Sequence, residues 1–424
     1  ILCGFVLLQS LGVRATIGIF AGINGLIGFL CMLLARISAE DGPEPAIQRE
    51  ASVRQTASSE PGRTEPLSGQ GLSWPLLIFA VSGLSAMAYE VFWTCLLGLI
   101  AGPTGYCFSI VVATFIIGLA LGSILFGRLA DKTRDPAFWL IISQMGAAVT
   151  ALAASQLLGN SQFLFAKLIY VFQDQFALRM LVQALVLFAV MLPTTLCSGA
   201  AFPLVNRICS RSLDTIGRSL GTAYALNTFG ALIGSFVAGF VLIPWLGKAG
   251  GLRLVILIQF SLSGIWLLQR NFSSQDRRTV RLAAVAGVLA MGLLSMSRFP
   301  TWRTDLLSRG WYRDFGDIEA DLQRLGWAEA LWQGSERIAG RRQGLSVVFT
   351  GEGAAGFTTV EKEITSLGNR EYAMFNSGKA DASSHGDCST QDLSAHIPLL
   401  FHPKARKVMV LGLASGMTSG EVLL

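Results

Sequence analysis

The sequence predicts a polytopic bundle of membrane-spanning α-helices followed by an α/β domain, which begins with a small antiparallel sheet and continues into the start of a Rossmann-like fold. The 424 residues are 52% hydrophobic and only 14% charged, with a mean hydropathy of +0.54, whereas a soluble chain carries about 25% charged residues. Several apolar runs reach the roughly 20 residues that a helix needs to cross a bilayer. Near the end of the chain, a wholly apolar run precedes a glycine-rich turn.

The charge distribution argues against nucleic acid as a partner. The net charge is +6, but residues 1–297 hold 19 basic and 12 acidic side chains, while residues 298–424 hold 14 and 15. The basic surplus therefore belongs to the apolar part, whereas a phosphate-binding surface should lie on a soluble face. We also expect no metal site and no disulfide framework, because the seven cysteines lie far apart and the three histidines form no ligand cluster at a usual spacing.

The first 36 residues contain two apolar runs, 1–11 and 15–34, and we expect them to be the end of a truncated first helical bundle. The chain begins inside the first run and ends directly after a strand-to-helix signal, so we expect a fragment cut at both ends. Residues 37–73 lack apolar periodicity and contain several Ser and Gly, which is typical of a flexible linker. We expect this linker to be cytoplasmic.

Residues 74–297 are predicted to form the main transmembrane bundle. Residues 74–126 contain a single charged side chain, Glu90, and the uncharged stretch 102–105 (Gly-Pro-Thr-Gly) breaks them into a helical hairpin. Further spans are predicted at 137–158, 179–202, 220–243 and 252–268, and a shorter apolar run follows at 282–297.

Basic residues in the loops predict the orientation, because cytoplasmic loops of membrane proteins are enriched in Lys and Arg. One alternating set of loops holds 14 basic residues and the opposite set holds five. The five are Arg14, Lys167, Arg179, Lys248 and Arg253. We therefore assign the first set to the cytoplasm, in a multi-pass protein of the plasma (inner) membrane whose main partner is the lipid bilayer.

The side on which the soluble domain lies depends on residues 282–297. If this run crosses the bilayer, the domain lies outside, but the run is only ~24 Å long as a helix, against a hydrocarbon core of about 30 Å. Arg298, Arg303, Arg309 and Arg313 follow it at once, as they would on a cytoplasmic flank. We therefore expect a re-entrant or interfacial segment and a cytoplasmic soluble domain.

Two matching heptapeptides suggest that a bundle has been duplicated. Residues 6–12 (Val-Leu-Leu-Gln-Ser-Leu-Gly) match residues 241–247 (Val-Leu-Ile-Pro-Trp-Leu-Gly), and each is followed by an Arg and a further apolar span. The alternative is that two apolar segments match by composition alone. Residues 127–134 (Gly-Arg-Leu-Ala-Asp-Lys-Thr-Arg) resemble the cytoplasmic loop that joins the second and third helices in the major facilitator superfamily, which implies a major-facilitator-like bundle.

Three polar side chains inside the apolar spans are candidate intramembrane site residues. Glu90, beside Tyr89, lies mid-span, where an ionised carboxylate is costly, so we expect it to face a cavity or the bundle interior. The alternative is a glutamate that only holds helices together. Asn227 lies on a segment with small residues at four-residue spacing, which is more typical of close helix packing than of a site.

The soluble part begins with β-like runs at 345–350, 356–360 and 372–375, separated by glycines, which predict a small antiparallel sheet. The apolar run 408–411 (Val-Met-Val-Leu) predicts a buried strand of a parallel sheet. The turn that follows, at residues 412–416, leads into a helix start and would let the backbone approach a nucleotide-like ligand.

These soluble motifs resemble, in order and spacing, the spermidine synthase (aminopropyltransferase) family. They are residues 376–383 (Asn-Ser-Gly-Lys-Ala-Asp-Ala-Ser), Asp387, residues 390–393 (Thr-Gln-Asp-Leu), residues 396–403 and the turn after residue 408. The stretches 89–93, 118–131 and 224–228 look like the membrane-fused bacterial branch of that family, so the resemblance covers nearly the whole chain. It implies a methyltransferase/aminopropyltransferase-type fold for residues 298–424 and a homodimer formed through this domain.

The resemblance also implies site residues. Gly412, Ser415 and Gly416 would contact decarboxylated S-adenosylmethionine or a related nucleoside as co-substrate, and Asp381 and Gln391 would contact the small amine or polyamine. The chain departs from the family pattern at three places: Ser415 stands for an acidic residue, residues 390–391 for a Tyr-His pair, and Asp381 for a Gln. The family's catalytic aspartate and ribose-binding acid would lie beyond residue 424, so no catalytic residue is assigned.

Two classes of function follow from the sequence. The first is a membrane-anchored aminopropyltransferase, in which a general base deprotonates an amine and the positive sulfur of an adenosylsulfonium donor leaves as a neutral thioether. The second is a carrier, in which the bundle moves a small solute such as a polyamine and the soluble domain regulates it or is a relic. Glu90 favours the carrier, and the turn at Gly412 favours the transferase.

Overall fold

The computed structural model describes residues 8–40, 73–209, 213–269, 301–313, 315–316, 318–336, 345–353, 356–364 and 368–423, with a few single positions between 279 and 297. The chain divides into two compact units, Ile1–Leu72 and Ser73–Leu424. The predicted linker at 37–73 lies outside the described residues apart from its ends, which belong to helices. Most of the apolar run at 282–297 also lies outside them.

The first unit contains α1 (Leu8–Glu40), which is broken near its start at Gly12, where φ is 74° and ψ is 172°. Glycine adopts this positive φ at little cost. The second unit has the same backbone conformation at Gly247, with φ 70° and ψ 169°. Each glycine ends one of the two matching heptapeptides, so the two segments share a backbone conformation at this position.

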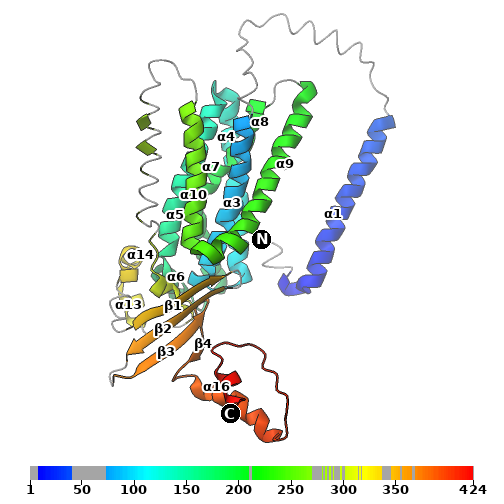
Figure 1. The fold of residues 1–424 in the computed structure, drawn as a ribbon. Coiled ribbons are helices and arrows are strands. Elements are labelled where there is room, and N and C mark those ends of the chain that lie inside the picture. Colours follow the sequence, from blue (N-terminus) through cyan, green and yellow to red (C-terminus); the bar gives the residue numbers. More distant parts are fainter. Residues whose placement is uncertain are drawn as a thin grey trace, which may run out of the picture. The chain divides into compact units, whose positions relative to one another are not determined.

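The second unit begins with a bundle of helices (Figure 1). The helices are α3 (Ser73–Ile100), α4 (Gly105–Lys132), α5 (Pro136–Gly159), α6 (Gln162–Val171), α7 (Phe176–Gly199), α8 (Ala201–Cys209), α9 (Leu213–Val237) and α10 (Ile243–Gln269). Within the described parts of both units, six helical stretches are long and apolar enough to cross a membrane. They confirm the predicted helical bundle and are compatible with a multi-pass membrane protein.

The boundaries of the helices agree with local sequence signals. α3 and α4 meet at residues 101–104, where Gly102 has a φ of 98° and the Thr104 hydroxyl caps α4 by accepting a hydrogen bond from the Cys107 N–H at 3.3 Å. The apolar stretch Ser219–Gln269 has 51 residues, or ~77 Å as a straight helix, which is more than twice the bilayer core. The chain instead reverses at Gly247, after the π-helical segment η2 (Ala238–Leu242) (Figure 1).

Small residues let α3 and α9 approach each other closely. A Cβ atom at Gly230 would lie 2.1 Å from the carbonyl oxygen of Ala80, and one at Gly234 would lie 2.2 Å from that of Leu84. Only glycine fits such a contact of backbone against backbone. This is the close packing that the spacing of small residues around Asn227 predicts.

The sheet has four antiparallel strands in the order β1 (Leu345–Gly353), β2 (Gly356–Ile364), β3 (Arg370–Asn376) and β4 (Lys379–Ser383). The first three confirm the predicted β-like runs. The sequence analysis missed β4, because Lys-Ala-Asp-Ala-Ser contains no β-branched or aromatic residue. Helices α16 (Cys388–Phe401) and α17 (Met417–Glu421) follow the sheet.

Residues 408–411, which we predicted to be a buried strand, are not a strand in the structure. Met409 is 79% exposed and Leu411 is 88% exposed. A strand needs a neighbour for its N–H and C=O groups, and among the described residues the sheet contains only β1 to β4. The Rossmann-like fold is therefore not confirmed.

The residues after position 300, which we call the soluble part, pack against α6 at one end of the bundle. The short helices α13 (Glu319–Arg324) and α14 (Trp327–Trp332) lie near it (Figure 1), and α12 (Thr304–Leu307) contributes Leu306 to an apolar cluster with α6. The apolar cluster that they share consists of Phe163 and Ala166 of α6 with Leu306, Trp311, Ile318, Leu322, Leu325 and Ala330. Lys167, which is 6% exposed, donates to the Leu322 carbonyl oxygen at 3.0 Å. Bundle and soluble part therefore share a core.

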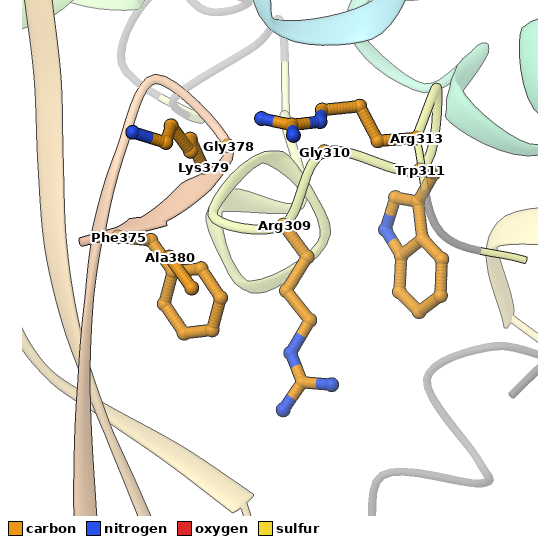
Figure 2. A pocket seen from close by; sticks show the side chains of 8 residues that line it. All are labelled: Arg309, Gly310, Trp311, Arg313, Phe375, Gly378, Lys379 and Ala380. Atoms are coloured by element: carbon orange, nitrogen blue, oxygen red, sulfur yellow. The ribbon is translucent and has the colours of Figure 1, made fainter. Parts of the chain in front are cut away.

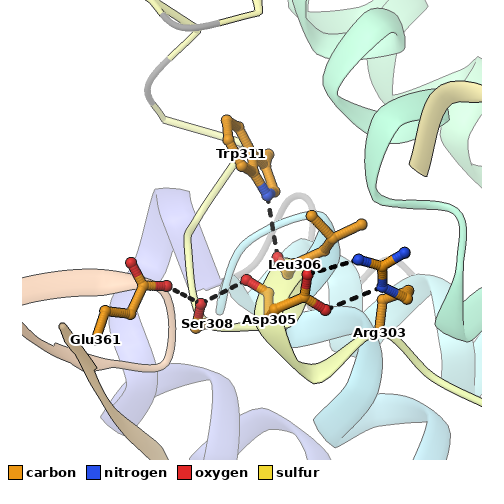
Figure 3. A network of polar contacts seen from close by, with 6 residues as sticks. All are labelled: Arg303, Asp305, Leu306, Ser308, Trp311 and Glu361. Atoms are coloured by element: carbon orange, nitrogen blue, oxygen red, sulfur yellow. Dashed lines mark hydrogen bonds and ion pairs between the residues drawn. The ribbon is translucent and has the colours of Figure 1, made fainter. Parts of the chain in front are cut away.

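A polar network holds residues 303–311 against β2 (Figure 3). The buried Ser308 hydroxyl hydrogen-bonds to the Asp305 carbonyl oxygen at 2.7 Å and to the Glu361 carboxylate. Glu361 is 2% exposed, and its carboxylate also pairs with Arg309 Nε at 3.0 Å. A buried carboxylate with two such partners fixes the position of the sheet relative to this segment.

Candidate functional site

The predicted nucleoside-binding turn has the backbone conformation that its glycines suggest. Gly412 has a φ of 91° and Gly416 a φ of 81°, and Ala414 between them also has a positive φ, of 44°. The Gly416 N–H donates to the Leu413 carbonyl oxygen at 2.7 Å, which closes the turn just before α17. A Cβ atom at either glycine would meet no described atom within 4 Å, so the backbone of the turn is open to a ligand.

The structure brings Ser415 and Gln391 together, although 23 residues separate them in the sequence. The Ser415 hydroxyl donates to Gln391 Oε1 at 2.6 Å, and the Thr418 hydroxyl donates to the Gln391 carbonyl oxygen at 3.0 Å. Gln391 lies in the first turn of α16, so these bonds dock the glycine turn onto that helix. Ser415, which we predicted to contact the nucleoside co-substrate, is therefore in contact with Gln391, which we predicted to contact the amine.

Asp381 does not join this pair. It lies on β4, and its carboxylate pairs with Lys379 Nζ at 3.3 Å. In the part of the chain that the structure describes, no hydrogen bond or ion pair joins Asp381 to residues 412–416. The predicted substrate-binding residues Asp381 and Gln391 are thus held by different partners.

A basic cavity of about 340 Å³ lies beside β4. Figure 2 shows that the side chain of Arg313 extends towards the turn that carries Gly378 and Lys379, whereas the Lys379 side chain points away from Arg313 and Arg309 points in a different direction from both. Arg309 stacks on the Phe375 ring at 5.4 Å. The lining residues are Arg309, Gly310, Trp311, Arg313, Phe375, Gly378, Lys379 and Ala380. Two of its three cations are paired with carboxylates outside the lining, Arg309 with Glu361 and Lys379 with Asp381, and the lining itself contains no acidic side chain that could bind a polyamine.

Inside the bundle, Tyr89 starts a chain of buried polar side chains. The Tyr89 hydroxyl donates to Gln259 Oε1 at 2.6 Å, and Gln259 Nε2 donates to Gln144 Oε1 at 2.9 Å. These side chains come from α3, α10 and α5, and all three are at most 2% exposed. Gln144 Nε2 is buried without a hydrogen-bond partner. Such an unsatisfied donor is costly away from water, so it marks a place where a ligand or water could bind.

Glu90 and Asn227 occupy different surroundings. Glu90 is partly buried, and no hydrogen bond or ion pair joins it to another described residue. Asn227 lies against α3, because a Cβ atom at Gly83 would come within 2.4 Å of its carbonyl oxygen. Of the three candidates, the structure therefore brings Tyr89 into a buried polar network, as one end of the chain that runs through Gln259 to Gln144.

Several polar residues of the bundle were missed by the sequence analysis. Gln144, Gln183 and Gln259 are each at most 4% exposed, and each lies in a predicted span. The signal that could have found them is an amide side chain within an apolar run, since a buried amide also needs partners.

The described residues contain no group of three or more His, Cys, Asp or Glu side chains that could hold a metal ion. Comparison of the chain with models of known families, with curated proteins and with solved structures finds no match.

Proposed function

We propose that the chain is a membrane-anchored transferase of the aminopropyltransferase type, which acts on an adenosylsulfonium donor and an amine. The observation that supports it most directly is the hydrogen bond between Ser415 and Gln391, because it joins the glycine turn to the helix that carries the amine-side residue. The left-handed conformations of Gly412 and Gly416 leave the backbone of the turn accessible.

Each of these residues has a role in the proposed reaction. The N–H groups of the turn and the Ser415 hydroxyl suit the hydroxyl groups of a nucleoside, and the Gln391 amide orients Ser415. An amine attacks the carbon next to the sulfonium only after losing its proton, so the reaction needs a general base close to the amine. No described residue is assigned to that base.

Binding of an adenosyl compound by the full chain tests this proposal. Calorimetry with S-adenosylmethionine should detect binding that Gly412→Val weakens, because a branched side chain is strained at a φ of 91° and blocks the approach of the ligand. Gly368→Val is the matched control, since Gly368 also has a positive φ and open surroundings but lies elsewhere. Absence of binding by the wild-type chain contradicts the proposal.

A second candidate function, transport of a small solute by the bundle, is favoured by the buried chain from Tyr89 to Gln144. A polar chain across three apolar helices could receive a solute in the bundle interior. Glu90→Gln keeps the shape of the side chain and removes its charge. Because Glu90 has no partner among the described residues, the melting temperature should stay normal, while uptake by proteoliposomes should fall if Glu90 handles the solute. Unchanged uptake would remove Glu90 from the transport proposal.

The side of the membrane matters for both functions. The soluble part contacts the bundle at Gly102, Gly159 and Lys248, through Tyr312, Trp302 and Glu352 respectively. These contacts lie at the bundle end opposite to the described basic positions of the larger set, which include residues 128–134 between α4 and α5 and Arg207 in α8. By the positive-inside rule, we propose that the soluble part faces away from the cytoplasm. This differs from the cytoplasmic location that the arginines after residue 297 favour, and an adenosyl donor would then be needed on the outer side.

Cysteine labelling decides the sidedness. Single cysteines at Lys132, in a basic loop, and at Glu363, on the exposed end of β2, are introduced into a cysteine-free chain. In intact cells, a membrane-impermeant maleimide should label Glu363→Cys and leave Lys132→Cys unlabelled until lysis. The reverse pattern would place the soluble part in the cytoplasm. The transferase would then need no adenosyl donor on the outer side of the membrane.

A further inference from the structure

A second cavity, of about 220 Å³, lies inside the bundle at the end that carries the soluble part. Its walls come from the α3–α4 loop, α4, α6 and α7, and Tyr312 of the soluble part also lines it. The lining is mostly apolar, and its charged side chain is Arg179. The lining residues are Ala101, Gly102, Thr104, Tyr106, Cys107, Ile110, Phe165, Ile169, Phe176, Arg179, Met180, Gln183, Leu187 and Tyr312.

Arg179 is a cation without a counterion in this cavity. Its Nε atom is buried and has no hydrogen-bond partner, and its guanidinium lies over the Phe176 ring at 5.4 Å. No ion pair joins it to a carboxylate in the described part of the chain. The side chain as a whole is partly exposed, so the unpartnered group is the buried Nε–H, and a buried donor without a hydrogen-bond partner is costly.

Gln183 supplies a second unpartnered polar group in the same cavity. It lies one helical turn after Arg179 on α7, it is 4% exposed, and no hydrogen bond joins its side chain to any described residue. The start of α7 adds to the positive potential, since the N-cap residue Gln175 makes no side-chain capping hydrogen bond and helix N-termini carry partial positive charge. A guanidinium, an amide donor and a helix N-terminus all favour an oxyanion.

We propose that this cavity binds a small oxyanion with an apolar body, with its charged end on Arg179 and Gln183 and its apolar end against Ile110, Phe165 and Leu187. A monocarboxylate in solution and the phosphate of an anionic lipid share this chemistry. The site is distinct from the proposed transferase site, because an adenosylsulfonium and a polyamine are both cations. Tyr312 joins the cavity to the sheet by donating to the Ser377 carbonyl oxygen at 3.1 Å, so an occupant would contact both bundle and soluble part.

The test uses the full chain in nanodiscs of zwitterionic lipid and three probes: butyrate, its isosteric neutral amide butanamide, and butylamine, a cation of similar length. Butyrate should raise the melting temperature in a concentration-dependent way, butanamide much less, and butylamine not at all, because only the first carries the negative charge that Arg179 requires. Stabilisation by butylamine, or none by butyrate, would overturn the proposal.

Variants then assign the effect to the cavity. Arg179→Gln should weaken butyrate binding by about tenfold or more, since a charge-assisted pair is lost, and Arg179→Lys should weaken it less. Gln183→Leu should weaken it severalfold. These variants should fold, because neither side chain has a hydrogen bond to lose. Arg207→Gln, the same change at an exposed site on α8, is the control. Equal butyrate binding by Arg179→Gln and Arg207→Gln would refute the site.

Changing the lipid of the nanodiscs distinguishes a lipid phosphate from a soluble carboxylate as the natural occupant. If a lipid phosphate is the natural occupant, discs of phosphatidylglycerol should abolish the response of the wild-type chain to butyrate, and Arg179→Gln should bind less phosphatidylglycerol in native mass spectra. If a soluble carboxylate is the occupant, the response should persist in both kinds of disc.

Discussion

Cys388 shows how one contact affects the chemistry of a partly exposed side chain. Its thiol donates a hydrogen bond to Asp392 Oδ2 at 3.5 Å in the first turns of α16. This hydrogen bond, together with the negative charges of Asp392 and Glu421, raises the pKa of the Cys388 thiol above its ordinary value. Because the thiolate is the reactive form, Cys388 should react slowly at neutral pH.

The first prediction follows from the raised pKa of the Cys388 thiol. Asp392→Asn removes the charged acceptor, so the thiol pKa should fall towards its ordinary value and alkylation by iodoacetamide at pH 8 should become faster. Peptide mass spectrometry over pH 7 to 10 measures the rate at Cys388. Glu421→Gln should have a smaller effect, since its charge acts without a hydrogen bond to the thiol. An unchanged pH profile in Asp392→Asn would contradict the assignment.

The polar residues also show what the sequence could and could not predict. Gly412 and Gly416 could be singled out, because a glycine-rich turn before a helix requires their positive φ. The bond between Ser415 and Gln391 could not, because it depends on how α16 and α17 pack. The cavity around Arg179 was equally hidden, since its walls come from helices that are distant in the sequence.

The helices of the bundle are where the sequence was most informative. Each span must satisfy its backbone hydrogen bonds within a helix because lipid offers no partners, and it needs about 20 residues to cross the bilayer core. Breaks such as Gly-Pro-Thr-Gly therefore mark where one span ends and the next begins. The strand prediction at 408–411 was wrong because a strand, unlike a helix, needs hydrogen bonds to a second segment. An apolar run becomes a strand only when a neighbouring strand is present. Hydrophobicity alone does not supply that neighbour.

The second prediction concerns the contact between α3 and α9. Gly234→Ala places a methyl carbon 2.2 Å from the Leu84 carbonyl oxygen. This distance is too short for a contact, so the two helices must separate. We expect a loss of about 1–3 kcal/mol in the free energy of unfolding, measured by thermal melts in detergent. Gly221→Ala, on the same helix with no neighbour within 4 Å, should be neutral or stabilising by up to about 1 kcal/mol. Equal effects of the two changes would exclude tight packing as the cause.

Across the second unit, one ion pair links the sheet to the membrane bundle. Glu352, in β1, accepts hydrogen bonds from the Lys248 backbone N–H at 2.7 Å and from Lys248 Nζ at 2.9 Å. The Lys248 side chain is 6% exposed, and its ammonium also lies 4.6 Å from the centre of the Phe357 ring. The carboxylate therefore caps the helix that starts after Gly247 and neutralises a buried cation.

The third prediction tests this link. Glu352→Gln leaves Lys248 buried without its counterion, so we expect a loss of about 1.5–3 kcal/mol in stability, measured by thermal melts in nanodiscs. Lys379→Gln breaks a pair in which the lysine side chain is 62% exposed, and it should cost less than about 1 kcal/mol. If Glu352→Gln costs no more than Lys379→Gln, the pair does not hold the sheet to the bundle.

The position of α6 has a consequence for biogenesis. Phe163 and Ala166 share an apolar cluster with side chains of residues 306–330, which are synthesised after α7, α8, α9 and α10. Until those residues emerge and fold, α6 leaves the translocon with an uncovered apolar face and with Lys167 lacking its carbonyl acceptor. The nascent bundle is therefore a client for chaperones, and a ribosome that stalls before residue 306 releases a product that quality-control proteases can recognise.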